Sequence, residues 1–244
     1  MNPGPTLATT VRVAQQLRRD PRTLALVFVV PPLLLVLFRY VFSGQKETFD
    51  RIGGPLVGIF PFTLMFVVTS IAMLRERTTG TLERLMTMPL AKLDLLVGYG
   101  IAFACVAAVQ ASITSAVAFG LLGLHVAGPV WVVVLLAVGN AVLGMSLGLF
   151  ASAFARTEFQ AVQFMPAFVL PQFMLCGLIV PRERMAHVLD VASYALPLTW
   201  AYDALARATR DDLGGALVRD ALIVAAVALL ALALGATTLR RRTP

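Results

Sequence analysis

The chain has 244 residues, of which 59% are hydrophobic and only 14% are charged, with a mean hydropathy of +0.84 and a formal net charge of +7. Soluble domains carry about a quarter charged residues, whereas here the apolar residues come in long blocks, so the composition excludes an ordinary soluble domain and indicates an integral membrane protein. The positive charge is then expected beside the cytoplasmic face of the membrane, and no nucleic-acid partner is predicted.

The first segment is polar and carries one helical pattern. Leu7, Val11, Ala14 and Leu17 recur at helical spacing, with arginines towards the end of the segment. This pattern predicts an amphipathic helix lying on the inner membrane surface, where membrane lipid is its partner.

Six later blocks are long enough to cross a membrane. About 20 apolar residues cross the hydrocarbon layer as a helix. The expected spans are at about 24–42, 55–74, 95–122, 130–154, 159–180 and 221–239. The sequence therefore predicts an all-α integral membrane protein with six transmembrane helices in a single domain, 1–244.

A polar stretch, 75–94, separates the second and third spans and is longer than a simple loop requires. Thr-Thr-Gly is predicted to end the preceding helix, and a short helix is expected to follow and to stop at Pro89. Leu82, Leu85 and Met86 share one face of it. Such a short helix is marginal alone in water, so it must lean on lipid headgroups or on a partner. The alternating charges favour ion pairs with a protein partner.

Small and amide side chains mark the later spans. Gly144, Gly148 and Ser152 form a small-residue stripe on the fourth span, which predicts close helix packing, either within the chain or at a dimer seam. The amides Gln110, Asn140, Gln163 and Gln172 could line a substrate path or hydrogen-bond between helices. No carboxylate lies deep in a span, which argues against an ion-coupled carrier.

The stretch 181–220, before the last span, is too polar to cross the membrane. Its apolar residues predict one or two short helices leaning on the outer edge of the bilayer, with Tyr194, Trp200 and Tyr202 as interfacial aromatic residues.

The chain carries no motif that predicts catalysis. It has no Gly-rich phosphate-binding loop and no GxSxG elbow, and His125 and His187 lack a ligand partner at metal-binding spacing. The sequence therefore predicts no catalytic residue, no bound metal and no bound cofactor.

Charge places the expected spans relative to the membrane. If both termini are inside, the inner segments carry twelve of the 20 basic residues and five of the 13 acidic ones. This bias predicts a multi-pass protein of the cell membrane with both termini in the cytoplasm.

Two stretches resemble one family. RERTTGTLERLMTMPL, residues 75–90, resembles the signature after the second span of ABC type-2 exporter permeases. PQFMLCGLIVPRERM and LDVASYALPLTWAYDALAR resemble the fifth span and the short extracellular re-entrant helices of the same family. The short outer segment is most similar to the daunorubicin-resistance type of permease.

The resemblance implies a permease that works as a dimer, with an identical or paralogous second copy, and with a separate ATP-binding subunit that hydrolyses ATP with Mg²⁺. A cytoplasmic coupling helix at about 76–90 would dock on that ATPase. The residues implied in coupling are Arg75, Glu76, Gly80, Thr81, Leu82, Glu83, Leu85, Met86 and Pro89. The expected activity is export of a hydrophobic or amphipathic compound, such as a drug, a lipid or a lipid-linked molecule. The alternative is a membrane anchoring or assembly subunit that does not transport.

Overall fold

The computed structural model describes residues 3–81 and 92–238, and over these ranges the chain is helical and contains no strand. The elements are α1 (Pro3–Arg18), α2 (Pro21–Val41), α3 (Lys46–Thr78), α5 (Lys92–Ala116), η1 (Val117–Leu121), α6 (Val130–Ala151), α7 (Glu158–Leu175), η2 (Arg182–Arg184), α8 (His187–Ser193), α9 (Pro197–Thr209) and α10 (Gly215–Thr237).

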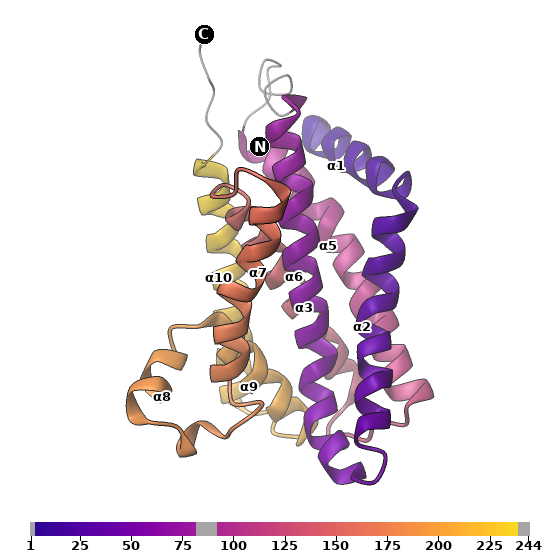
Figure 1. Ribbon diagram of the computed structural model, residues 1–244, viewed down its shortest axis with the longest axis vertical. Coiled ribbons are helices and arrows are strands. Elements are labelled where there is room, and N and C mark those ends of the chain that lie inside the picture. Colours follow the sequence, from indigo (N-terminus) through magenta and orange to yellow (C-terminus); the bar gives the residue numbers. More distant parts are fainter. Residues whose placement is uncertain (1–2, 82–91, 239–244) are drawn as a thin grey trace.

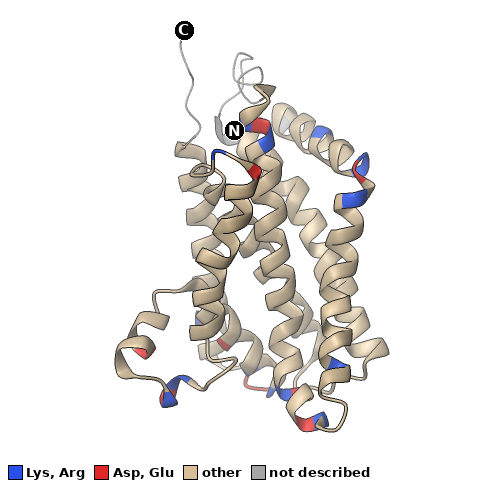
Figure 2. Cartoon of the chain, in the orientation of Figure 1, with Lys and Arg blue, Asp and Glu red and all other residues tan. Residues whose placement is uncertain are grey.

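The long helices form one bundle with distinct ends. Figure 1 shows α2, α3, α5, α6, α7 and α10 running along a common direction, with α1 across one end and α8 and α9 at the other. The charged residues of the described chain gather in two bands at these ends and leave an apolar layer between them (Figure 2). This layering is what a bilayer requires, because charged side chains are costly in hydrocarbon.

Five helices are long and apolar enough to cross a membrane. They are Pro21–Val41, Lys46–Thr78, Asp94–Leu121, Val130–Ala151 and Gly215–Thr237. The predicted fifth span, 159–180, corresponds to α7, an 18-residue helix that packs against α3 but does not reach the same hydropathy. One glutamate and three glutamines in α7 are the cause. The predicted count of six spans is therefore not confirmed for the described residues.

Helix α3 extends well beyond the apolar block that predicted it. It begins at Lys46 rather than near residue 55, and Glu47 lies in its first turn, where a negative charge suits the helix dipole. Phe49, in this polar first part, is only 2% exposed and packs into the core. Hydropathy alone missed the first helical turns of α3, before residue 55, because it indicates which residues lie in the membrane rather than where a helix begins.

The centre of the bundle is the contact between α3 and α6. A Cβ atom on Gly144 would lie 2.1 Å from the carbonyl oxygen of Phe62, and one on Gly148 would lie 2.3 Å from that of Phe66. The Thr69 hydroxyl lies 3.1 Å from the Met145 carbonyl oxygen and donates to it across the same contact. Small residues therefore bring the two backbones together, as in other membrane bundles.

Helix α9, in the stretch 181–220 where short helices were predicted at the outer edge of the bilayer, packs into the end of the bundle. Leu198, Ala201 and Leu205 are fully buried, and the helix packs among α3, α6, α7 and α10. A Cβ on Gly128 would lie 2.1 Å from the Ala208 carbonyl oxygen. Because the small residues of α9 share one face, the helix fits closely between its neighbours.

Helix α1 packs on the bundle through the face opposite the apolar one that was predicted to lie on membrane lipid, and the apolar face stays exposed. Leu7 and Val11 are 65% and 47% exposed, whereas Thr9 and Val13 are buried against α5. Gly98 of α5 permits this approach, because a Cβ atom there would lie 2.6 Å from the Thr9 Cβ.

Candidate functional site

The C-terminal end of α3 is the first candidate site, because the predicted coupling segment begins there. Helix α3 ends at Thr78, where the Thr-Thr-Gly break was expected, and Gly80 has a φ of +71°. That left-handed conformation favours glycine and turns the chain away from the helix. The Thr79 and Thr81 hydroxyls lie 3.0 Å apart.

Only part of the predicted coupling set can be placed. Arg75, Glu76, Gly80 and Thr81 lie together at this end of α3. The predictions for Leu82, Glu83, Leu85, Met86 and Pro89 fall outside the described residues.

Glu76 is the centre of a partly buried polar cluster that joins α1, α3 and α5. It is 9% exposed, and its Oε1 accepts hydrogen bonds from Gln16 Nε2 at 3.2 Å and from Arg12 Nη1 at 3.4 Å. Arg12 also donates to the Tyr99 hydroxyl and lies 5.4 Å from the centre of that ring. The second carboxylate oxygen of Glu76, Oε2, is buried and has no hydrogen-bond partner.

Arg75, the neighbour of Glu76, makes a separate ion pair at the surface. Its guanidinium donates two hydrogen bonds to Glu158 at the start of α7, at 2.7 and 3.1 Å. Both side chains are 54% exposed, so this pair adds little stability, but it links α3 to α7. Arg75 and Glu76, which were predicted to contact a partner protein, each have an ion-pair partner within the chain as well.

A cavity of about 560 Å³ lies beside these two residues. Its walls come from α1, α2, α3 and α5. Asp20, at its rim, caps α2: its carboxylate accepts from the Thr23 hydroxyl at 2.6 Å and from the Thr23 amide at 3.1 Å. These hydrogen bonds hold the pKa of Asp20 below its ordinary value. The cavity is thus polar where α1 crosses the bundle.

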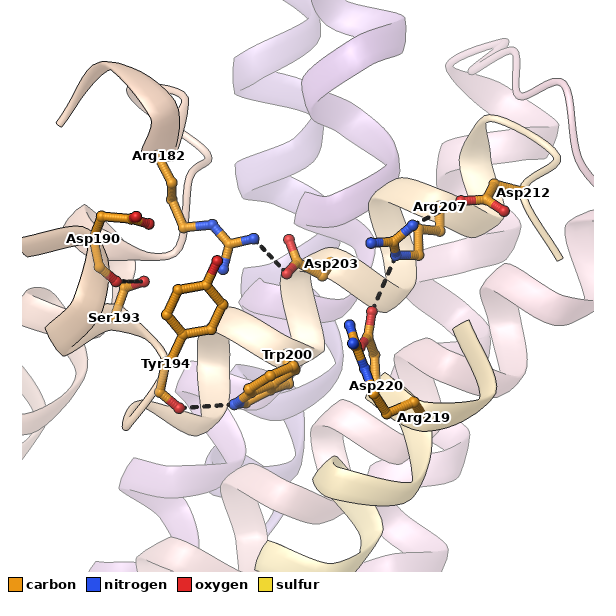
Figure 3. Close-up of polar contacts among 10 residues, drawn as sticks. All are labelled: Arg182, Asp190, Ser193, Tyr194, Trp200, Asp203, Arg207, Asp212, Arg219 and Asp220. Carbon is orange, nitrogen blue, oxygen red and sulfur yellow. Dashed lines mark hydrogen bonds and ion pairs between the residues drawn. The ribbon is translucent and has the colours of Figure 1, made fainter. Parts of the chain in front are cut away.

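The opposite end of the bundle holds a second cluster, of arginines and aspartates (Figure 3). Asp220, fully buried at the start of α10, accepts from Arg207 of α9 at 3.1 Å and from Arg219 at 2.8 Å. Arg207 also pairs with Asp212 at 2.8 Å. The cluster therefore fastens α9 to the beginning of α10.

A further pair in Figure 3 fastens η2 to α9. Arg182 donates to Asp203 at 2.7 Å, and both side chains are mostly buried. Burial raises the pKa of Asp203, and the neighbouring Arg182 guanidinium opposes that rise. The Trp200 indole donates to the Tyr194 carbonyl oxygen at 2.9 Å, so these two predicted interfacial aromatic residues contact each other.

The three residues predicted for helix packing are buried within the helix bundle of one copy. Gly144 and Gly148 face α3, and Ser152, also buried, donates to the Leu149 carbonyl oxygen at 2.6 Å. The contact of the two glycines is thus accounted for by packing within one copy.

The four predicted amides lie on three helices, in different surroundings. Gln110 and Asn140 are buried on α5 and α6, and both have amide atoms without a hydrogen-bond partner. Gln172 is also buried, but it accepts from the Leu198 amide at 3.2 Å and so holds the start of α9. Gln163 is exposed on α7. None of the four lines the cavity beside Glu76.

Sequence reasoning missed Arg12, Gln16 and Tyr99. The available signals were weak: Arg12 follows an exposed apolar residue in α1, and Tyr99 lies near the polar start of the third apolar block.

The described fold and its polar ends define a multi-pass membrane protein with an apolar middle layer. Residues 6–208 match the family model for "ABC-2 type transporter", so the chain belongs to this family of ABC transporter membrane proteins.

Three relatives illustrate the likeness. The chain is 25% identical over 199 residues to "ABC transporter G family member 20" of Dictyostelium discoideum, covering 80% of this chain and 27% of that protein. It is 29% identical over 137 residues to "Probable multidrug ABC transporter permease YbhR" of Escherichia coli, covering 55% of this chain and 36% of the relative. The match to "Inner membrane transport permease YhhJ" of E. coli is 27% identical over 149 residues, 60% of this chain and 40% of the relative. Each match thus spans less than half the length of the relative.

Proposed function

We propose that this chain is the membrane-spanning permease subunit of an ATP-driven ABC exporter in the cell membrane. It exports a hydrophobic or amphipathic compound, and it works with a second permease copy and a separate ATP-binding subunit that binds ATP with Mg²⁺. The observation that carries the proposal is the family match over residues 6–208, which includes the coupling segment as well as most of the helices. The E. coli relatives named as multidrug or transport permeases support the class of cargo.

In this proposal α7 also crosses the membrane, which brings the number of spans to six, and both termini are cytoplasmic. An even number of spans returns the chain to the side on which it began, so α1 and the end of α10 share one side of the membrane. The position of both at one end of the bundle in Figure 1 supports this orientation, and so does the excess of basic residues in the segments assigned to the cytoplasm. Helix α1 would lie at the inner membrane surface, and α8 and α9 at the outer one.

The coupling segment, 76–90, docks on the ATPase through the face that carries Leu82, Leu85 and Met86. Closure of two ATPase subunits would push this segment, and α3 would move with it because α3 leads directly into it. The Arg12–Glu76 pair would pass the movement to α1, and the Arg75–Glu158 pair would pass it to α7. The path for the compound would open at the interface between two permease copies. The chain itself contributes no catalytic group.

The proposal is tested by recovery of the ATPase with tagged permease from membranes, the first candidate being a P-loop ATPase encoded by a neighbouring reading frame. Glu83→Arg, and Leu82→Asp combined with Leu85→Asp, are expected to lower recovery by about tenfold or more, because they place unpaired charge in a protein interface. Glu47→Arg is the matched control, since it reverses an exposed glutamate at the opposite end of α3.

Undiminished recovery together with full transport by the Glu83→Arg variant would refute the assignment of the coupling segment. Normal ATPase binding with no transport of any compound in a panel of amphiphiles would instead favour the anchoring or assembly subunit.

A further inference from the structure

One continuous stripe of α3 faces the cavity beside Glu76. The stripe begins with Leu64, Val67, Val68, Ile71 and Ala72, and it continues with Arg75 and Glu76. The steps of three and four residues place all of them on one side of the helix. The five apolar members are half-buried, while the residues between them are buried in the core. The stripe is thus a wall that the other described helices leave open.

The cavity is graded from apolar to polar along its length. From Leu64 to Glu76 the stripe rises by about 18 Å, at 1.5 Å per residue. Leu26 of α2 and Phe103 of α5 continue the apolar part, whereas Thr23 and Tyr99, one turn away on the same helices, continue the polar part. Three helices therefore change polarity at the same level. An amphiphile with its head group near Glu76 and its hydrocarbon towards Leu64 matches this gradient.

The polar part of the cavity needs a hydrogen-bond donor. Glu76 Oε2 is buried without a partner, and an unsatisfied carboxylate oxygen is costly. Asp20 adds a second carboxylate at the rim. Arg75 also lines the cavity, but both of its hydrogen bonds are directed to Glu158. Glu76 Oε2 is therefore the carboxylate oxygen left for a ligand, because both oxygens of Asp20 accept from Thr23 and Arg75 is paired with Glu158.

We propose that this cavity binds an amphiphile with an ammonium head group, which donates a hydrogen bond to Glu76 Oε2 while its alkyl chain lies along the apolar stripe of α3. The volume of about 560 Å³ is within the range of small-molecule sites. An anionic head group is disfavoured, because it would face the unpartnered carboxylate oxygen of Glu76. The ammonium could belong to a membrane lipid head group or to a free long-chain amine. The site lies within one copy of the chain and goes beyond the proposed function.

The test uses the full chain, without ATPase, in phosphatidylcholine nanodiscs, so its outcome does not depend on the transport proposal. The probe is hexadecylamine carrying a photoreactive diazirine, and labelled peptides are mapped by mass spectrometry. We expect labelling of α3 between Leu64 and Ala72, and weaker labelling by the matching hexadecanoate probe. Glu76→Gln should reduce the affinity for the amine by about tenfold or more, because a charge-assisted hydrogen bond is lost.

A second variant separates loss of the site from loss of the fold. Ala72→Phe fills the apolar part of the cavity without touching Glu76, and should also abolish labelling. Leu230→Phe, on a 57% exposed position of α10, is the control and should leave labelling unchanged. Size-exclusion chromatography of each variant checks that the chain is folded.

The lipid and free-amine sources are then distinguished by repeating the labelling in phosphatidylethanolamine nanodiscs. Competition by that lipid identifies a bilayer lipid as the occupant, and unchanged labelling identifies a free amine, so either result supports the site. Labelling spread equally over α10, equal binding of hexadecanoate, or no effect of both Glu76→Gln and Ala72→Phe would overturn the proposal.

Discussion

Replacing Gly144 with alanine should destabilise the chain because it forces α3 and α6 apart. The added Cβ would lie 2.1 Å from the Phe62 carbonyl oxygen and 2.8 Å from its carbonyl carbon. The nearest neighbours are backbone atoms of Phe62, so relief requires a helix to move rather than a side chain to rotate. Overpacking of this kind costs about 1–3 kcal/mol of unfolding free energy.

Gly139 provides a matched control on the same helix. A Cβ at that position meets nothing within 4 Å, so Gly139→Ala should be neutral or should stabilise α6 by up to about 1 kcal/mol through helix propensity. The two variants should therefore differ by about 1–4 kcal/mol in unfolding free energy, measured by reversible denaturation in detergent micelles at a fixed protein concentration. Equal stability of the two variants would refute the packing argument. If Gly144→Ala instead weakened cross-linking between two copies at unchanged stability, the small-residue stripe would be a dimer seam.

Two further predictions concern the aspartates at the α9 end of the bundle. Asp220→Asn should lower the unfolding free energy by about 3 kcal/mol or more, because Asp220 is fully buried between two arginines. Asp212→Asn should lower it by less than about 1 kcal/mol, since Asp212 is half exposed. Equal losses for the two variants in denaturation experiments would contradict the role of burial. Burial raises the pKa of Asp203, so the folded chain holds the carboxyl proton of Asp203 more tightly than the unfolded chain does. The contribution of protonated Asp203 to stability should therefore grow as pH falls through the raised pKa and be lost as pH rises above it. Asp203→Asn should remove that part of the pH dependence of the unfolding midpoint. If the midpoint instead rises with pH more steeply in the wild type than in the variant, the ion pair with Arg182 outweighs burial.

The sequence predicted the long helices well where apolar residues form unbroken blocks. The spans at 24–42 and 130–154 correspond closely to α2 and α6, and the Thr-Thr-Gly break falls at the end of α3. α7 is the ambiguous case, because glutamines and prolines lower the hydropathy of a helix that nevertheless packs against α3. Composition alone therefore does not decide whether α7 crosses the membrane.

The burial of α9 and the partners of the charged residues were not predictable. The alanines of α9 are neutral in a hydropathy count, and only the close approach of neighbouring helices makes them a buried face. Arg12 and Glu76 are 64 residues apart, so nothing in the local pattern pairs them. The sequence identified Glu76 as a residue at the coupling end, but its contact with α1 depends on how α1 crosses the bundle.

The unbroken length of α3 has a mechanical consequence. Its 33 residues span about 50 Å, well over the roughly 30 Å of hydrocarbon in a bilayer, so one continuous helix reaches both polar layers. A tilt of about 5° around its centre would carry its two ends in opposite directions by roughly 2 Å each, on the length given by the helix rise. The packing of Gly144 and Gly148 against α3 lies between those ends, where such a pivot has least displacement. Pro55 and Pro61 lie within α3 between this pivot and Lys46, and each removes a backbone hydrogen bond, so force applied at Thr78 would move the Thr78 end of the helix more than the Lys46 end.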